Sequence, residues 1–243
     1  MSSSSSKPYL LALDTSSTRA GAALAGPGGE ILAESALEVG HGRGEALAGC
    51  VRDILEQTQI AIDAVGTLAV ARGPGSFTGT RIGLAMARGL ALVDDLPVVG
   101  IDSLELLVHS AGDVDTRLCA VIAAGHDRLY MAGYQRDDTG RRCTRPPAVI
   151  SFSELDPAIA EWGGRVVLCA ERETLDRVRA EQAAKRPDRL VAVPEVRARF
   201  LAELATTRLD SAEPAAAVLP VYVAETAARP NRNRVVASPG APD

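Results

Sequence analysis

The sequence predicts an α/β protein built as two lobes, and three observations support that fold class. The 243 residues are enough for two lobes of about 100 to 120 residues each. Apolar residues make up 47% of the chain and the formal net charge is −5, so the chain can bury a core and its composition does not indicate disorder. Strands followed by alternating helices and strands occur in the first half and, in weaker form, again in the second.

The first half is expected to begin with a meander of three strands. An apolar run at residues 9–13 predicts a buried strand that ends on Asp14 and a hydroxyl-rich turn. Strands at 20–25 and 31–39 follow, joined by Gly-Pro-Gly-Gly, because glycine adopts the backbone angles of a tight reversal. The rest of this half alternates between helices at 45–58, 81–93 and 102–111 and strands at 65–71 and 98–101.

The second half is expected to repeat this plan less clearly. Strands are predicted at residues 118–122, 129–135, 149–152, 166–169 and 190–193, with helices from 153, across 172–184 and at 194–206. No repeat in the sequence itself proves that the halves are duplicates. We therefore divide the chain into a flexible N-terminus (1–8), a first lobe (9–112), a second lobe (113–223) and a flexible tail (224–243), which is polar and rich in proline.

Composition and cysteine spacing indicate a cytoplasmic protein with no membrane segment. The four cysteines have no C-x-x-C spacing, which argues against a zinc knuckle or a redox pair and predicts reduced core thiols. The most apolar segment, residues 82–93, contains Arg88 and is far shorter than the about 20 residues that a membrane span needs. The mild acidity argues against a chain that wraps nucleic acid by itself.

The segment Arg72 to Gly83 (RGPGSFTGTRIG) is the most informative motif, and it leads from a strand into a helix. Free N–H groups at the start of a helix can hold an anion. The segment lacks the Gly-Lys-Ser/Thr of a P-loop and the G-x-G-x-x-G spacing, so a tight strand-to-helix turn explains it better than a nucleotide site does.

The helix after this motif is apolar nearly all round and must be covered on two sides. Gly79, Gly83, Ala87 and Ala91 form a stripe of small residues, while Ile82, Met86 and Leu90 lie on another side. One side can pack on a sheet, and the other requires a second helix at close approach. The pattern alone leaves open whether that helix belongs to this chain or to a partner.

Asp14, at the end of the first strand, is the only candidate for contacting Mg²⁺-nucleotide through water. A second carboxylate would have to come from the other lobe, but the corresponding strand ends at Ala123-Ala124-Gly125. The alternative is that Asp14 caps the amides of Ser16 or Ser17 in its own turn.

No other catalytic or metal-binding arrangement is evident. None of His41, His109 and His126 has another histidine within five residues, and no serine lies in a G-x-S-x-G motif. The three arginines of the tail, Arg229, Arg232 and Arg234, can touch RNA phosphate, but a solvated tail is the better explanation of so few charges.

Three segments together resemble the TsaB (YeaZ) family. They are LALDTSS at residues 11–17, the motif from 72 to 83 continued by ARGLA at 87–91, and PVVGIDSL at 97–104. The resemblance covers roughly the first 110 residues well and the second half only in outline. It implies two ribonuclease-H-like lobes of the superfamily that includes actin, hexokinase and the heat-shock chaperone nucleotidases.

The resemblance also implies a role and a partner. In that family the protein is the non-catalytic partner of TsaD, the transferase that makes threonylcarbamoyladenosine next to the anticodon of certain tRNAs. Its first-lobe helices pack against the matching helices of TsaD, which favours a partner at the small-residue helix. The expected partner interface comprises Gly79, Ile82, Gly83, Met86, Ala87, Leu90 and Ala91.

The resemblance implies further partners and ligands. They are a TsaE-like ATPase in a larger complex, a homodimer through the same helix, indirect contact with tRNA, and ATP or ADP at the partner interface rather than a cofactor of its own. Family members usually have Asp-Ala-Arg where this chain has Ala123-Ala124-Gly125, so this chain departs from the family at that motif.

Three hypotheses remain. The leading one is an essential accessory subunit, not an enzyme by itself, that binds and activates a TsaD-like transferase. The second is an actin-like enzyme that hydrolyses ATP or transfers phosphoryl groups with Asp14. The third is a glycopeptidase-type metalloprotease, for which the sequence offers no pair of ligands.

Overall fold

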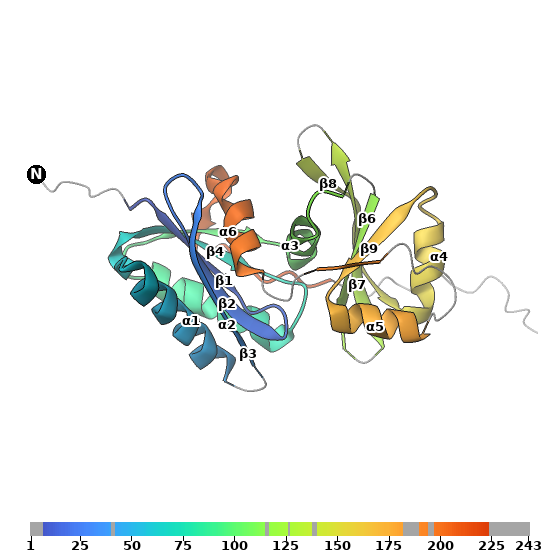
Figure 1. The fold of residues 1–243 in the computed structure, drawn as a ribbon, viewed down its shortest axis with the longest axis horizontal. Coiled ribbons are helices and arrows are strands. Elements are labelled where there is room, and N and C mark those ends of the chain that lie inside the picture. Colours follow the sequence, from blue (N-terminus) through green and yellow to red (C-terminus); the bar gives the residue numbers. More distant parts are fainter. Residues whose placement is uncertain are drawn as a thin grey trace, which may run out of the picture.

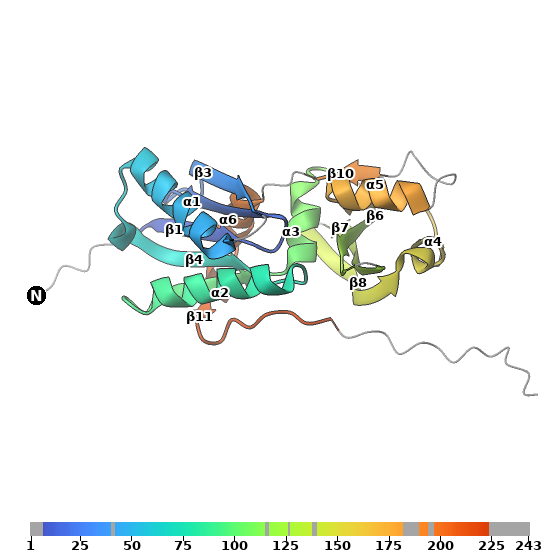
Figure 2. The same ribbon diagram turned by 90° about the horizontal axis from the view of Figure 1, so that it is seen from below.

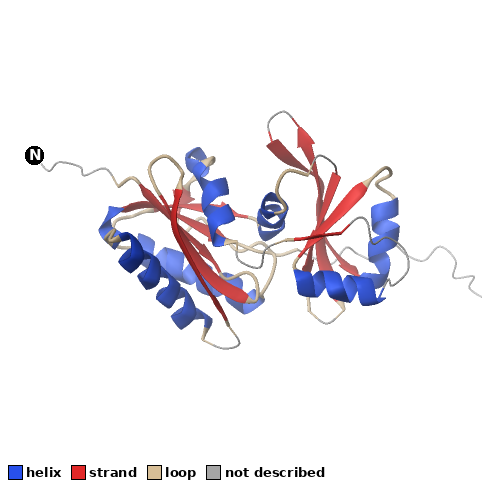
Figure 3. Cartoon of the chain, viewed as in Figure 1, coloured by secondary structure: helices blue, strands red, loops and turns tan. Residues whose placement is uncertain are grey.

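A computed structural model gives the structure of residues 7–39, 42–114, 117–125, 127–137, 140–181, 190–193 and 197–223. Within these residues the chain forms two lobes, each a β-sheet flanked by helices (Figures 1 and 3). The predicted two-lobed α/β architecture is confirmed. The predicted flexible segments lie largely or wholly outside the described residues, at 1–6 and 224–243.

The first lobe contains a six-stranded sheet in the order β11-β5-β4-β1-β2-β3. The strands β1, β2 and β3 form the predicted antiparallel meander, and β4 and β5 continue the sheet in parallel from β1. Their bounds are β1 Tyr9–Asp14, β2 Arg19–Ala25, β3 Ile31–Glu38, β4 Val65–Ala71, β5 Pro97–Ile101 and β11 Glu213–Pro214.

Helices cover both faces of this first sheet. On one face, α1 (Arg43–Thr58) and α2 (Phe77–Ala91) bury a core around Leu11, Leu13 and Leu68. On the other face, α6 (Ala198–Thr206) packs its alanines and leucines against β1 and β2. Full burial of one such leucine contributes about 1.5 to 3 kcal/mol, so these two layers hold the lobe together.

The second lobe repeats the strand order in a five-stranded sheet, β10-β9-β6-β7-β8. In both lobes the third strand of a meander lies at one edge, the first strand lies at the centre, and two strands parallel to it follow. The bounds are β6 Arg117–Ala123, β7 Arg128–Asp137, β8 Gly140–Ser151, β9 Val166–Ala170 and β10 Leu190–Ala192.

The helices of the second lobe also cover both faces. The outer face carries α4 (Leu155–Ala160) and α5 (Arg172–Glu181), whereas the inner face packs against α3 (Ser103–Ser110). The strand β8 begins nine residues before the predicted start at 149 and contains two prolines. It lies at the edge of the sheet, where proline is tolerated because one side of the strand needs no ladder bonds.

The predicted boundaries between the lobes are wrong for two helices. We expected α3 in the first lobe and residues 194–206 in the second, but α3 packs its Leu104 and Leu107 on the second sheet and α6 packs on the first. Both helices are rich in buried apolar residues, and sequence order alone does not say which sheet covers them. Figure 1 shows α3 between the lobes, where Leu106 also reaches the first-lobe core.

After α6 the chain returns along the first lobe. Residues 215–223, which we call the strap, run beside α2 (Figure 2). The strap is held by Arg88 of α2, whose guanidinium donates to the carbonyls of Ala215 and Val218 at 3.3 and 2.8 Å. None of the helices in the described part of the chain has the length and apolar character needed to cross a membrane.

Candidate functional site

The glycine-rich motif folds into the predicted tight turn between β4 and α2. Ser76 caps the helix, because its Oγ accepts a hydrogen bond from the Gly79 N–H at 3.2 Å. The Ser76 N–H in turn donates to the Ser16 carbonyl at 3.0 Å, which ties this loop to the turn after β1. The helix therefore begins at Phe77, four residues before the predicted start.

Glycine is required in this motif because the turn after β1 lies directly against it. A Cβ atom on Gly79 would lie 2.0 Å from the Thr15 carbonyl oxygen, and one on Gly75 would lie 2.6 Å from the Ser16 carbonyl oxygen. Thr15 Oγ1 also donates to the Gly79 carbonyl at 2.7 Å. The motif thus serves close packing between two segments of the first lobe.

The stripe of small residues on α2 faces inward, which corrects the expectation that it meets a partner. Gly79, Gly83, Ala87 and Ala91 are all buried, and a Cβ on Gly83 would lie 2.6 Å from Thr15 Oγ1. The small residues let α2 pack closely on the sheet of its own lobe and on the turn after β1. These four residues therefore belong to the core rather than to an exposed interface.

The other three predicted interface residues lie on the side of α2 that faces α1. Ile82, Met86 and Leu90 are half-buried, and Met86 and Leu90 pack against the first-lobe core. A shallow, mainly apolar groove runs along α1 and the segment after it, and reaches α2 at Leu90. Its lining is Ala48, Val51, Arg52, Leu55, Glu56, Gln59, Ile60, Ala61, Ile62 and Leu90.

Two strongly exposed apolar side chains follow the end of α2. Leu92 and Val93 are 84% and 81% exposed, and Ile62 is 43% exposed. We call the groove together with Leu92 and Val93 the α1–α2 surface. Two helices that leave such side chains in water can bury them against another protein.

A second exposed group lies at the start of α2. The Arg81 guanidinium lies 3.7 Å from the ring centroid of Phe77, and it donates to the Tyr222 hydroxyl at 2.9 Å. Both rings are about 60% exposed. Sequence reasoning missed this group because Tyr222, in the strap, is 141 residues away from Arg81.

Asp14 lies at the end of β1, is 3% exposed, and does cap its own turn. Its Oδ1 accepts hydrogen bonds from the N–H and the Oγ of Ser16 at 2.9 and 2.7 Å. The sequence left two roles open for Asp14, a contact to Mg²⁺-nucleotide or a cap of its own turn, and the geometry is that of the cap. The predicted capping of Ser16 is confirmed.

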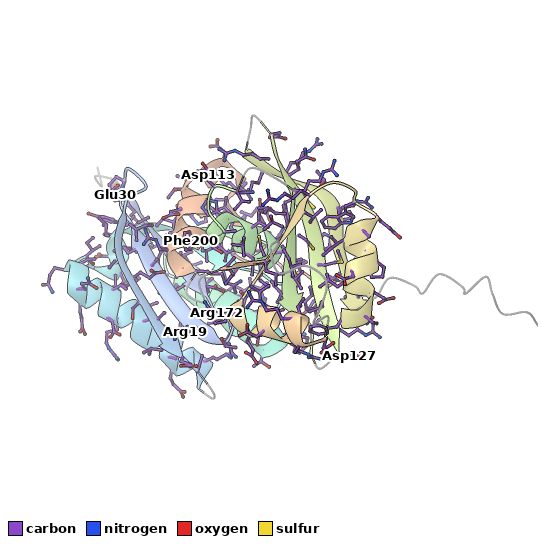
Figure 4. All side chains as sticks on the ribbon, turned by 45° about the vertical axis from the view of Figure 1, so that its right-hand side comes forward. Arg19, Glu30, Asp113, Asp127, Arg172 and Phe200 are labelled. Atoms are coloured by element: carbon purple, nitrogen blue, oxygen red, sulfur yellow. The ribbon has the colours of Figure 1, made fainter. Side chains whose placement is uncertain are left out.

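The other oxygen of Asp14 faces an arginine that joins the lobes. Arg197, which is almost fully buried, places its Nε 3.5 Å from Asp14 Oδ2 and its Nη2 3.2 Å from Glu171 Oε1. Glu171 immediately precedes α5, whose first residue is labelled in Figure 4, so the guanidinium bridges the two lobes. A metal ion facing Asp14 would have to displace this guanidinium.

Nothing in the sequence pattern indicated this role of Arg197. It lies far from Asp14 in the chain, and only the fold brings the two together. A single arginine between a short strand and a helix is usually exposed to solvent, so its burial in the core could not be expected from the sequence. The cost of burying it is repaid by two carboxylates, since an unpaired buried charge is strongly destabilising.

The second lobe has a smaller turn at the position that corresponds to Asp14. The Ala124 N–H donates to the Arg128 carbonyl at 2.8 Å, and Gly125 has a φ of 91°, which favours glycine. Ala123, Ala124 and Gly125 thus close the β6–β7 hairpin. They place no carboxylate opposite Asp14.

Of the other titratable groups, His109 lies between the lobes. Burial lowers its pKa from the ordinary value, and the Glu203 carboxylate, 3.6 Å from Nε2, offsets part of that effect. Among the described residues no group of three or more His, Cys, Asp and Glu side chains is placed to hold a metal ion. His41 and His126 lie outside the described residues.

The cysteines are core thiols with one exception. Cys50, Cys119 and Cys169 are buried and free, and burial raises the pKa of Cys169 to about 12. Cys143 was also predicted to lie in the core, but it is exposed on the edge strand β8, whose range the sequence underestimated. A raised thiol pKa makes all four poor nucleophiles at neutral pH.

Comparison with known families and relatives supports the resemblance seen in the sequence. Residues 40–218 match the family model described as TsaD: tRNA N6-adenosine threonylcarbamoyltransferase. The chain is 42% identical over 92 residues to the tRNA threonylcarbamoyladenosine biosynthesis protein TsaB of Escherichia coli K12, which is 37% of this chain and 40% of the relative. It is 32% identical over 130 residues to TsaB of Haemophilus influenzae, covering 53% and 54%. These matches therefore span about half or less of the relatives' lengths.

Two solved structures extend the likeness over the whole fold. One, a protein from Pseudomonas aeruginosa described as uncharacterized and similar to the peptidase YeaZ, has a TM-score of 0.75 at 29% identity, covering 89% of this chain and 99% of that one. The other, YeaZ from Pseudomonas aeruginosa, has a TM-score of 0.72 at 26% identity, covering 88% and 99%. The arrangement of both lobes is thus shared with structures of YeaZ type.

Proposed function

Because the chain belongs to the family described by the TsaD model, we propose that it acts as a cytoplasmic accessory subunit of the TsaB type. In this role it binds a TsaD-like transferase and supports threonylcarbamoyl modification of the adenosine next to the anticodon in tRNA. The transfer itself belongs to the partner. The TsaB relatives, whose names place them in biosynthesis of this modified nucleoside, support the assignment.

The observation that carries the proposal is the α1–α2 surface. Within the segment that matches the family model, α1 and α2 leave an apolar groove and the exposed side chains of Leu92 and Val93 in water. The matching helices of a homologous transferase are suited to fill such a groove, since related folds present related ridges and grooves. Of the predicted interface residues, Leu90 lines this surface and is joined by the exposed Leu92 and Val93, whereas the small-residue stripe is buried.

The contact between the lobes at Asp14 supports a non-catalytic role. Asp14 is the residue with which an actin-like enzyme would contact Mg²⁺-nucleotide. Its carboxylate instead accepts hydrogen bonds from Ser16 and faces Arg197. The residues at this point do not fit a metal-bound nucleotide, because a guanidinium already balances the charge. We therefore propose no cofactor for this chain alone.

Further components of the assembly follow from the same proposal. ATP or ADP at the partner interface, a TsaE-like ATPase in a larger complex, a homodimer through the α1–α2 surface, and tRNA held mainly by the partner are all consistent with an accessory subunit. Binding measurements with and without the TsaD-like transferase distinguish these components, because they show whether the nucleotide, the ATPase or tRNA binds this chain by itself. The comparisons favour neither a stand-alone ATPase nor a metalloprotease.

Sedimentation of this chain mixed with the TsaD-like transferase of the same organism tests the proposal. We expect a stable heterodimer at micromolar concentration, and Leu92→Glu should abolish it while leaving the melting temperature unchanged. Leu209→Glu is the matched control, because Leu209 is 50% exposed beside α6, whose packing covers the opposite face of the same sheet.

Two outcomes would contradict the proposal. The first is sedimentation as separate monomers. The second is ATP turnover by the purified chain that Asp14→Asn abolishes, which would favour the actin-like enzyme instead.

A further inference from the structure

The β6–β8 segment of the second lobe is strongly basic in a chain that is acidic overall. Residues 117–151 contain six arginines and three acids, Asp127, Asp137 and Asp138. The formal charge of the whole chain is −5. The six arginines are Arg117, Arg128, Arg136, Arg141, Arg142 and Arg145.

Two of these arginines stabilise the end of α3. Arg136 forms an ion pair with Asp113, and Arg141 donates to the carbonyls of Gly112 and Val114. They hold the tip of the β7–β8 hairpin against the helix that lies between the lobes. Their positive charges therefore already have a structural use.

Arg117 and Arg145 instead line a small polar niche together with Trp162. The niche has a volume of about 190 Å³, and its other lining residues are Gln135 and Thr144. Arg117, Gln135, Thr144 and Arg145 are exposed, and Trp162 is half-buried at the end of α4. All five side chains thus reach solvent from one spot on the lobe.

The niche is held in shape by the backbone beneath it. A Cβ atom on Gly133 would lie 2.8 Å from the Trp162 ring and 2.9 Å from the Arg145 Cβ, so only glycine lets both side chains approach the strand. The Arg117 guanidinium donates to the carbonyls of Trp162 and Gly163 at 2.6 and 2.9 Å, which fixes the turn that carries the indole. The indole is therefore fixed in place on the sheet.

This combination of groups suits one nucleotide of a single strand. Aromatic rings and guanidinium planes stack on unpaired bases, arginine binds phosphate, and an amide such as that of Gln135 bonds to base edges. The Arg145 guanidinium carbon lies over the indole ring, 5.9 Å from its centroid, so the positive charge and the aromatic ring are presented together. A volume of 190 Å³ is below the about 300 to 1,000 Å³ of drug-sized pockets, which favours a single base over a whole cofactor.

We propose that Trp162, Arg145 and Arg117 form a contact site for one nucleotide of single-stranded RNA, with its base on the indole and its phosphate on the arginines. An acidic peptide would pair with the arginines but would leave the Trp162 ring and the Gln135 amide unused, so RNA fits the observations better. The identification of this RNA as a loop of tRNA rests on the proposed function. The chain would then touch the RNA directly, through the lobe that does not carry the α1–α2 surface.

The single tryptophan of the chain makes this site directly observable. Trp162 fluorescence of the full chain should be quenched on titration with a single-stranded oligoribonucleotide and with tRNA at about 50 mM salt. Adenosine monophosphate, titrated separately, distinguishes a free nucleotide from a nucleotide within RNA. We expect saturable quenching by both RNAs and much weaker quenching by the monophosphate.

Two variants test the arginine contact. Arg145→Gln should weaken RNA binding about tenfold and lower the dependence of log K on log salt by about 0.7, as expected for one lost phosphate contact to a single strand. Arg199→Gln, on α6 of the other lobe and 50% exposed, removes the same charge and should change neither quantity. Anisotropy of labelled RNA with Trp162→Ala gives a second measurement, with a loss of about fivefold or more expected.

Unchanged fluorescence with both RNAs, or equal weakening of RNA binding by Arg145→Gln and Arg199→Gln, would overturn the proposal. Stronger quenching by the monophosphate than by RNA would also overturn it, because the ligand would then be a free nucleotide. Arg145→Gln is remote from the α1–α2 surface, so heterodimer formation by this variant should be normal. If the wild-type chain forms no heterodimer with the TsaD-like transferase, the proposed function is contradicted. The fluorescence titration still tests the RNA site separately.

Discussion

In the first lobe the turn after the central strand carries Asp14, which faces a buried arginine, whereas in the second lobe the same turn carries Ala123, Ala124 and Gly125. Apart from the extra edge strand β11 in the first lobe, the strand order of the two sheets is the same. Their surfaces differ as well, since the first lobe exposes an apolar groove and the second a basic hairpin. The two lobes thus share a sheet topology and differ in their turns and surfaces, which is where binding residues are commonly placed.

The bridge between the lobes should show the largest effect. Arg197→Ala leaves Asp14 and Glu171 without their shared partner, so we expect it to lower the free energy of unfolding by about 3 to 5 kcal/mol in urea denaturation. Arg199→Ala, next to it but half-exposed on α6, should cost less than about 1 kcal/mol. Equal losses in the two variants would show that the bridge contributes no more than a surface ion pair.

Two glycines of α2 provide the next comparison. Gly79→Ala should destabilise the protein by about 1 to 3 kcal/mol, because the new methyl group overlaps the Thr15 carbonyl. Gly89 lies on the same helix, and a Cβ atom added there would meet no other atom within 4 Å, so Gly89→Ala should stabilise the protein by about 0.5 to 1 kcal/mol. Thermal and urea unfolding of both variants measure the difference, and a neutral Gly79→Ala would contradict the inward orientation of the stripe.

The contact between α3 and α6 should add a modest pH dependence. The pKa of His109 is lowered in the folded state, mainly by burial and further by Arg141 and Arg208, while Glu203 opposes this. The unfolded chain therefore binds this proton more readily, and stability should fall as the pH drops below about 6.5. His109→Gln should lose this part of the pH dependence between pH 8 and 5, and an unchanged profile would show that His109 does not titrate differently on folding.

The second-lobe turn should show the smallest effect. Ala123 is exposed, so Ala123→Asp should change the free energy of unfolding by less than about 0.5 kcal/mol in urea denaturation. Asp14→Ala in the first lobe should be far more costly, since it removes the acceptor of two hydrogen bonds and half of the charge that balances Arg197. Similar costs at the two turns would contradict the difference between the lobes.

Much of the fold could be predicted from the sequence because its signals are local. The meander at residues 9–39, the helix after the glycine motif and the capping of Ser16 by Asp14 follow from short patterns of apolar, glycine and hydroxyl residues. The lobe boundaries could not be predicted in this way. The helices α3 and α6 are apolar on several sides, and only the tertiary fold decides that each one packs on a sheet of the other half.

The candidate sites show the same limit. The small-residue stripe on α2 indicated close approach correctly, but its period is the same whether the neighbour is a sheet or a partner helix. Arg197 and Tyr222 act through residues more than 100 positions away, so no local pattern marks them. Trp162 and Arg145 meet only because Gly133 of the intervening strand leaves room for both.

Reconstitution of tRNA modification tests the central claim most directly. The TsaD-like transferase and its activated substrate would be assayed on tRNA without this chain, with the wild-type chain, and with Leu92→Glu or Leu209→Glu. We predict that the wild-type chain and Leu209→Glu strongly increase modification, that Leu92→Glu does not, and that the chain alone transfers nothing. Transfer by this chain without the transferase, or equal modification with and without it, would contradict the account.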